Sequence, residues 1–291
     1  MDAALRAALV RSLGLDIVAA TPTPGGSINA AYRVRLGDGR EVFVKAHAHA
    51  PRGMFEAEAR GLAWLRAGAG EHLRVPDVSL LDPAGDAARY LVLPWIEVVP
   101  RTPAHDEQAG RGLAALHRSG LALAWGLDHD NYVGTVLQRN GVGWTSWPHF
   151  WREARLEPRV RSLRERGLLE RGDVQRFDRL YVALDELVGE HEPARLHGDL
   201  WSGNLLFDRH GPLVIDPAVY VGVREVDLVM WSLFSPPRPR MFAAYDEAWP
   251  LAPGWRERVD LYRLYPLLVH VELFGGGYQA PLRDALRRYV T

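Results

Sequence analysis

The stretch "LHGDLWSGNLLF", residues 196–207, contains side chains that could move a proton beside a bound metal ion. Asp199 could accept the proton of a hydroxyl group and orient its oxygen for attack. Asn204 and, at the end of the apolar run "LVID", Asp216 offer hard oxygen ligands of the kind that Mg²⁺ prefers. A base and two oxygen ligands for Mg²⁺ are the main groups that phosphoryl transfer from a nucleotide needs, so this stretch predicts that chemistry.

The spacing of these residues narrows the prediction. The loop fits the pattern H-x-D-L-x-x-x-N of a kinase catalytic loop, with His197, Asp199 and Asn204 at its polar positions. Asp216 stands where kinases carry the aspartate of the D-F-G motif. Asp and Asn also form caps and turns, but types and spacing that agree together disfavour that interpretation. His197 is as suited to ordering its own loop as to contacting a substrate, so we leave it out of the catalytic set.

The N-terminal part supplies the other half of such a site, in the order that a kinase requires. The turn "PGGSIN" offers the backbone N–H groups of Gly25, Gly26 and Ser27 to phosphate oxygens. Lys45, in "EVFVKA", would bind the α- and β-phosphates, and Glu58, in the next helix, would hold its ammonium group. Lys45 is the only lysine in a chain with 34 arginines. Because a guanidinium is larger and has its donors in a fixed fork, we expect that arginine cannot replace it.

Two departures from the protein-kinase pattern indicate a small-molecule substrate. Gly198 stands in place of the arginine of H-R-D, and Asp216 is followed by Pro217 and Ala218. The helical pattern "VDLVMWSLF" begins about ten residues later. This leaves no room for a phosphorylated activation loop and no arginine to bind one.

The elements that must position these residues are expected in two lobes. Residues 16–46 have the pattern of three strands with an Asp-Gly turn, and "GMFEAEARGLAWLRAG" that of an amphipathic helix. Two more strands are expected at 75–82 and 88–96, and short strands at 196–216. Long helical patterns occupy 147–190 and 225–290. The sequence therefore predicts an α+β, bilobal protein-kinase-like fold. Its small β-rich N-terminal lobe would comprise residues 1–97 and its larger, mainly helical C-terminal lobe residues 98–291.

Composition excludes several other classes of protein. The 291 residues are 47% hydrophobic with a formal net charge of −1, and the charges are scattered, which disfavours binding to nucleic acid or to a membrane surface. No apolar run is long enough to span a bilayer and the N-terminus lacks a cleavage site, so we expect a cytoplasmic protein. The absence of cysteine excludes disulfides and thiolate metal sites. Nothing in the sequence indicates an oligomeric state.

Seven stretches resemble, in the same order, those of the fructosamine kinases, or ketosamine 3-kinases. They extend from about residue 24 to residue 278 and read "GGSIN", "VFVK", "MFEAEARGL", "DHDNYVGT", "HGDLWSGN", "DPAVYVGVREVDL" and "LFGGGY". This family has the aminoglycoside-phosphotransferase-like form of the protein-kinase fold. The combination of "GDLWSGN" with "DPAVY" separates it from its relatives better than the bare kinase pattern does.

The resemblance implies the roles given above for the lysine, the glutamate, the base and the two metal ligands. It also implies that "LVLPWI" is the hinge, where the Pro94 carbonyl and the Ile96 N–H would meet the adenine of ATP. Trp201 is similar to a tryptophan that faces the sugar in this family, and an aromatic face suits the apolar side of a sugar. The implied reaction is ATP- and Mg²⁺-dependent phosphorylation of the 3-hydroxyl of a small or protein-linked ketosamine, whose unstable product releases the amine in deglycation repair.

Other functions remain open at this stage. A kinase of the same fold could act on an aminoglycoside, choline or a sugar, although the many arginines at 150–180 disfavour a polycationic aminoglycoside. A catalytically inactive nucleotide-binding protein would usually have lost the base, the lysine or a metal ligand, and all are present here. The aromatic stretch "WTSWPHFW", residues 144–151, could line a pocket or pack the helical lobe. "GGGY" is more typical of a helix end than of a phosphate site, and His117 of a buried structural histidine.

Overall fold

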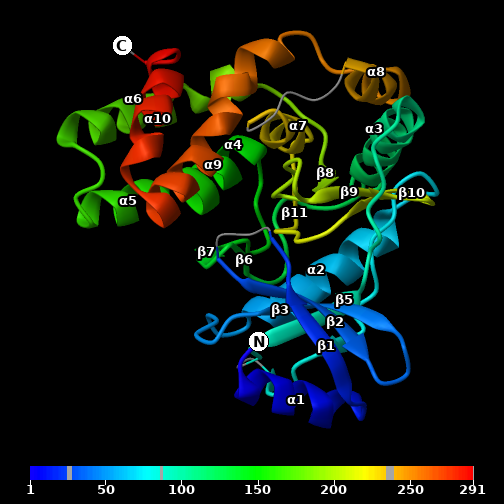
Figure 1. Cartoon of the computed structure of the whole chain (residues 1–291). Coiled ribbons are helices and arrows are strands. Elements are labelled where there is room, and N and C mark those ends of the chain that lie inside the picture. Colours follow the sequence, from blue (N-terminus) through cyan, green and yellow to red (C-terminus); the bar gives the residue numbers. More distant parts are fainter. Residues whose placement is uncertain (25–27, 86–87, 234–238, 291) are drawn as a thin grey trace.

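The computed structural model describes residues 1–24, 28–85, 88–233 and 239–290, which form a sheet-containing part and a larger helical part (Figure 1). The five-stranded sheet has the order β1-β2-β3-β5-β4, and every neighbouring pair is antiparallel. Its strands are β1 (Ile17–Pro22), β2 (Ala30–Leu36), β3 (Glu41–Ala46), β4 (Leu80–Leu81) and β5 (Tyr90–Pro94). The predicted Asp-Gly turn joins β2 to β3, with Gly39 at φ +86°.

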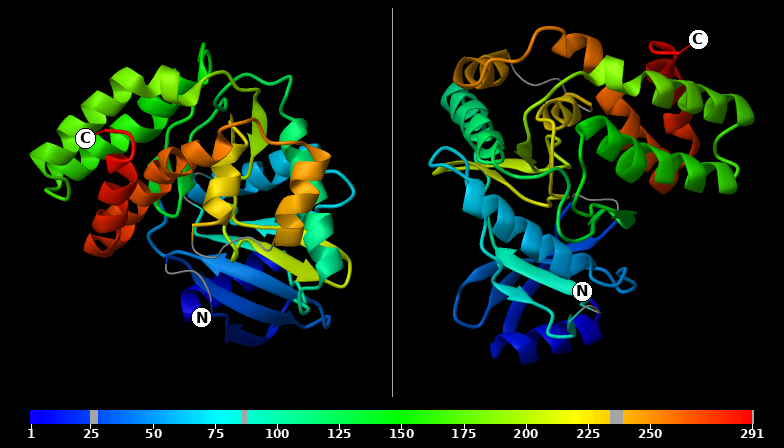
Figure 2. Two further views of the ribbon diagram at one scale, coloured as in Figure 1. Left: turned by 90° about the horizontal axis from the view of Figure 1, so that it is seen from above. Right: turned by 180° about the vertical axis from the view of Figure 1, so that it is seen from behind.

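Each face of this sheet is covered by a different helix. Side chains of a strand point alternately to the two faces, and in β3 the buried Val42 and Val44 belong to the cluster that includes Leu9 of α1 (Ala3–Leu13). Phe43 and Lys45 therefore lie on the opposite face, against α2 (Met54–Gly68). Helix α2 lies between the sheet and the helical part, as Figures 1 and 2 show from three directions. The alternation of β3 thus places Lys45 on the side of the sheet that faces the other lobe.

The helical part is built around α9 (Val259–Phe274). The other elements of this part are α3 (Pro103–Arg118), α4 (Trp147–Phe150), the π-helix η2 (Trp151–Leu156), α5 (Glu157–Glu165), α6 (Arg171–Val188), α7 (Glu225–Trp231), α8 (Pro239–Ala248) and α10 (Gln279–Arg287), with short 3₁₀ turns η3 (Trp255–Arg258) and η4 (Gly276–Tyr278). One hydrophobic core runs from α2 into these helices and includes Phe55, Leu62 and Leu268. The boundary at residue 97 stays a prediction, because this core is continuous across it.

Short strand pairs carry the loops of the helical part. They are β6 (Asn131–Val133) with β7 (Val136–Gln138), β8 (Ala194–Leu196) with β11 (Tyr220–Gly222), and β9 (Leu205–Asp208) with β10 (Gly211–Val214). The β6–β7 hairpin was not predicted from the sequence, and the strand predicted at 75–82 is reduced to the two residues of β4. Among the described residues, no helix is both long and apolar enough to cross a membrane.

The structure also separates packing residues from pocket residues. Trp147, Phe150 and Trp151 are buried, and the ring of Trp147 contacts the other two, with centroids 5.5 Å from Phe150 and 5.1 Å from Trp151. Within 144–151 these three rings therefore pack the helical core. Gly275, at φ +79°, ends α9 as "GGGY" predicted, and the buried His117 bonds to Tyr245 as expected of a structural histidine.

Candidate active site

The loop that carries the candidate base, residues 197–204, is held by the carboxylate of Asp227 in α7. The backbone N–H of His197 donates to Asp227 Oδ2 at 2.7 Å, and that of Gly198 to Oδ1 at 2.8 Å. Asp227 is fully buried, and His117 Nε2 lies 3.1 Å from its Oδ2. Sequence reasoning missed Asp227. The available signal was a charged residue inside the apolar helical run "EVDLVMW".

His197 orders this 197–204 loop, as its position in the motif allowed. Its Nε2 donates to the carbonyl of Ile215 at 2.9 Å, and its Nδ1 accepts from the N–H of Asp199 at 3.3 Å. Burial lowers the pKa of His197, so the ring is neutral and has the tautomer that these two bonds require. The side chain thus ties the loop to the strand that precedes Asp216.

The absence of an arginine from the H-x-D motif has a steric cause. Gly198 has φ +82°, in the left-handed region that side chains disfavour. A Cβ atom at this position would lie 2.0 Å from the carbonyl oxygen of Ala218. The 197–204 loop and the segment after Asp216 therefore approach too closely for any residue but glycine.

Asp199 and Asn204 lie side by side in the 197–204 loop. Asn204 Nδ2 donates to the backbone carbonyl of Asp199 at 2.8 Å, lies 3.3 Å from its carboxylate and 3.4 Å from the carbonyl of Asp216. Burial and the nearby Asp216 carboxylate raise the pKa of Asp199 to about 7. A carboxylate with this pKa can accept a proton near neutral pH.

Lys45 links the two lobes through carboxylates. Its Nζ lies 2.7 Å from Glu58 Oε2 and also contacts Asp216 Oδ1. Burial alone would lower the pKa of Lys45, but the charges of Asp216 and Glu58 raise it, so the ammonium stays protonated. Burial would raise the pKa of Asp216, yet the Lys45 charge lowers it, which keeps this carboxylate ionised. The structure thus brings Lys45 and Glu58 together, the pair that the sequence predicted, and adds a contact of Lys45 with Asp216 that it did not predict.

Asp216 is the sole non-glycine residue with a positive φ, +60°, in the described part of the chain. Aspartate tolerates this conformation better than most residues, and such backbone strain gathers at functional sites. Its side chain is 44% exposed although its partner Lys45 is 10% exposed. The left-handed turn therefore presents a charged carboxylate at a surface that a ligand can reach.

The donor set fits Mg²⁺. Among the described residues, the side-chain amide of Asn204 takes part in hydrogen bonds only as a donor, through Nδ2. Its oxygen Oδ1 is therefore left for a metal ion. Asp216 adds an ionised carboxylate. No cluster of three or more His, Asp or Glu able to hold a metal occurs among the described residues. Two oxygen ligands agree with the habit of Mg²⁺, which takes few protein ligands and fills its remaining positions with water and phosphate.

The other predicted residues lie around this centre. Pro94 ends β5 and is exposed, and the half-buried Ile96 follows it between the lobes. The ring of Trp201 folds back onto Gly203, where a Cβ atom would lie 2.3 Å from its Cη2. Gly25, Gly26 and Ser27 lie outside the described residues.

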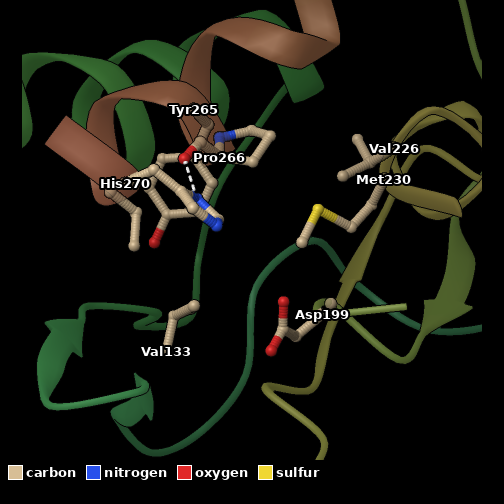
Figure 3. Close-up of a pocket in the computed structure, with 9 residues that line it drawn as sticks. Val133, Asp199, Val226, Met230, Tyr265, Pro266 and His270 are labelled. Atoms are coloured by element: carbon tan, nitrogen blue, oxygen red, sulfur yellow. Dashed lines mark hydrogen bonds between the residues drawn. The ribbon is translucent and has the colours of Figure 1, made fainter. Parts of the chain in front are cut away.

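A cavity opens beside the candidate base (Figure 3). This acceptor pocket, of about 10 Å³, is lined by Asp199, Gly198, Val133, two residues of α7 (Val226 and Met230) and four of α9 (Tyr265, Pro266, Val269 and His270). His270 lies across it from Met230, with Nδ1 2.7 Å from the Pro266 carbonyl. The enclosed volume of the pocket corresponds to about one water molecule. No local pattern in the sequence indicated the α9 wall.

A carboxylate at an apolar pocket, a buried lysine–glutamate pair and two oxygen donors that fit Mg²⁺ are together typical of a kinase-type phosphotransferase. The fold agrees, because a crystal structure of an aminoglycoside phosphotransferase superposes with a TM-score of 0.67 at 16% identity over 99% of each chain. The fold class predicted from the sequence is thereby confirmed.

The chain belongs to the fructosamine kinase family, whose model matches residues 1–291. A probable ketoamine kinase from Enterococcus faecium is 36% identical over 276 residues, covering 92% of this chain and 94% of that protein. One from Thermus thermophilus is 37% identical over 284 residues, covering 96% and 97%. The crystal structure of a candidate fructosamine-3-kinase from Thermobifida fusca superposes with a TM-score of 0.86 at 40% identity over 98% of each chain. The family resemblance seen in the sequence is confirmed.

Proposed function

We propose that this protein is an ATP- and Mg²⁺-dependent kinase that phosphorylates the 3-hydroxyl of ketosamines, as a step in deglycation repair. The observation that carries the proposal is the position of Asp199, at the wall of the acceptor pocket and in contact with Asn204. On the other side, Asp216 is bonded to Lys45. The acceptor pocket, the proposed base Asp199 and the proposed phosphate-binding groups therefore lie in this order across the site. The names of the relatives support a ketoamine as the acceptor.

In this proposal each side chain has one task. Asp199 accepts the proton of the acceptor hydroxyl and aims its oxygen at the phosphoryl group. Lys45, held by Glu58 at 2.7 Å, binds the α- and β-phosphates of ATP. Asn204 and Asp216 would hold Mg²⁺, which would neutralise charge on the phosphates.

The remaining assignments complete the binding of the two substrates. The Pro94 carbonyl and the Ile96 N–H would bond to adenine, and the backbone of Gly25, Gly26 and Ser27 would cover the phosphates. Trp201 would place the face of its indole against the sugar. Its fold onto Gly203 fixes the ring within the 197–204 loop and supports this role.

The test is ADP release with Mg-ATP against four acceptors: fructosyl-lysine, ribulosyl-lysine, kanamycin and choline. We expect turnover with a ketosamine and none with kanamycin or choline. The position of the new phosphate follows from ³¹P–¹H coupling in the product. Turnover confined to kanamycin or choline would replace the ketosamine proposal by another kinase activity, and no turnover with any acceptor would indicate an inactive kinase fold.

A further inference from the structure

A second hollow, of about 530 Å³, lies between the β6–β7 hairpin and the helices α5 and α9. Its polar walls come from Arg159 of α5, Arg166 at the end of α5 and Glu272 of α9. Thr135 and Leu273 line it as well. These residues have no role in the kinase motifs, and the proposed reaction does not use them. We call this hollow the arginine subsite.

The arginine subsite continues the acceptor pocket along the same two elements. In α9, Val269 lines the pocket and Glu272 and Leu273 line the subsite. Residues three and four apart share a helix face, about 5 Å further along the axis. In the hairpin, Val133 ends β6 and lines the pocket, and Thr135 lines the subsite from the turn that follows, before β7 begins at Val136. The two hollows are therefore consecutive along one path between the hairpin and α9.

Among the described residues that line the subsite, two arginines share one glutamate. Arg159 pairs with Glu272 at 3.0 Å, both side chains are about 15% exposed, and Ser162 Oγ donates to the same carboxylate at 3.1 Å. Arg166 is 48% exposed and lies 3.5 Å from that carboxylate, with one further bond to the Glu272 carbonyl at 3.2 Å. A guanidinium has five N–H donors, so Arg166 keeps several for another acceptor. Two arginines against one glutamate give the hollow a positive charge that suits one carboxylate.

We propose that the arginine subsite binds the α-carboxylate of a ketosamine whose amine is a free amino acid such as lysine. This inference rests on the proposed function. In a ketosamine the amine is attached at C1, two carbons from the hydroxyl at C3, so a lysine side chain leads away from Asp199. Its α-carboxylate then lies several bonds beyond the acceptor pocket, where Arg166 can receive it in a bidentate pair. In a lysine within a protein the α-carboxyl group forms a peptide bond and carries no charge, so the subsite favours ketosamines of free amino acids.

The test compares two ketosamines of the same sugar, one made with free lysine through its ε-amine and one with n-pentylamine. The pentyl compound has a similar chain but neither carboxylate nor α-ammonium. Arg166→Gln should raise KM for the lysine compound about tenfold or more, the loss expected for a hydrogen bond to a charged group. It should leave kcat, and KM for the pentyl compound, unchanged. Arg166→Lys, which keeps the charge, should recover part of the affinity.

The matched control is Arg161→Gln, which removes a 69% exposed arginine from the same helix, outside both hollows. It should change neither KM, and the Tm of all variants shows whether they fold. Equal KM of the wild-type protein for both compounds, or an Arg166→Gln effect shared by both, would overturn the subsite and leave the proposed function standing. Wild-type protein that phosphorylates neither compound would overturn the proposed function itself.

Discussion

The two sides of the candidate site are held by different forces. On the C-terminal side, residues 197–204 are fixed by backbone N–H groups that donate to the buried Asp227 and by the neutral ring of His197. On the N-terminal side, Lys45 is fixed by two carboxylates, one buried and one 44% exposed. No ligand can compete for the first set of bonds, because Asp227 is inaccessible. The second set includes an ion pair with an exposed carboxylate, which phosphates and Mg²⁺ would take over in the proposed function.

In the proposed function, this difference would give separate parts of the catalytic task to the two sides. A base must be in position before its substrate arrives, and preorganised hydrogen bonds provide that order. A phosphate-binding lysine must exchange partners, and an ion pair shared by Glu58 and Asp216 permits the exchange at little cost. We therefore expect substitutions on the C-terminal side to lower kcat and those on the N-terminal side to change the kinetics for ATP as well.

The largest effect is expected from Asp199→Asn, which removes the base and retains its shape. Turnover should fall at least about 10²-fold, the usual contribution of a general base. Binding of nucleotide, measured by calorimetry with Mg-ADP, should be unchanged because Lys45 and Glu58 are intact. Near-normal turnover would remove Asp199 from its proposed role and erase the contrast between the two sides.

Lys45→Arg should have the next largest effect and should act on the nucleotide. The lysine side chain is 10% exposed and enclosed by Glu58 and Asp216, so a longer planar group displaces both carboxylates. A displacement of about 1 Å can cost up to about 10²-fold, and we expect kcat/KM for ATP to fall by that order. The control is the converse exchange at a 69% exposed position, Arg40→Lys, which should alter nothing. Full activity of Lys45→Arg would show that any cation suffices.

Asp227→Asn tests whether the C-terminal side depends on one buried carboxylate. The two oxygens of Asp227 each accept one backbone N–H, from His197 and from Gly198, whereas the uncharged amide of asparagine has a single oxygen. Because one N–H group then loses its acceptor inside the protein, the free energy of unfolding should fall by about 3 kcal/mol. Turnover should fall about tenfold as the 197–204 loop loosens, with KM for ATP little changed. Asp178→Asn, on the exposed face of α6, is the matched control for denaturant unfolding and kinetics. A stable and fully active Asp227→Asn variant would place the order of the loop elsewhere.

Asp227 also shows where sequence reasoning stopped. Kinase chemistry fixes residue types and local spacing, which singles out Lys45, Glu58, Asp199, Asn204 and Asp216, and the structure brings their side chains together. The bonds of Asp227 join positions 29 and 30 residues apart and leave no periodic trace.

The same limit applies to packing. The acceptor wall on α9 lies far along the chain from the 197–204 loop. The strand expected at 75–82 shrinks to Leu80–Leu81, because local patterns do not specify how much of a segment finds a pairing partner. The β2–β3 hairpin, the α2 helix and the two-lobe order follow from local patterns, and the structure has them.

Gly203→Ala should produce the smallest effect. It tests whether the ketosamine binds at the C-terminal side of the candidate site, against Trp201. The backbone of Gly203 does not have a positive φ, so its conformation does not require glycine. The requirement comes from the ring of Trp201, because a Cβ atom at this position would lie 2.3 Å from it. Alanine should swing the indole aside and raise KM for the ketosamine about fivefold, the scale of one aromatic contact. KM for ATP should stay constant. Gly276→Ala, where a Cβ meets nothing within 4 Å, is the control.

A double-substitution cycle decides whether Gly203 acts through the indole. If Trp201 contacts the sugar, Trp201→Ala should raise KM by a similar factor, and adding Gly203→Ala to it should change nothing further, because the ring that a Cβ displaces is already gone. Additive effects would mean that Gly203→Ala instead perturbs its neighbour Asn204 and the C-terminal side, and kcat would then fall together with the rise in KM. If Gly203→Ala changes only KM for the ketosamine, and this change disappears in the Trp201→Ala background, then the indole contributes to binding of the ketosamine and does not affect the position of Asp199.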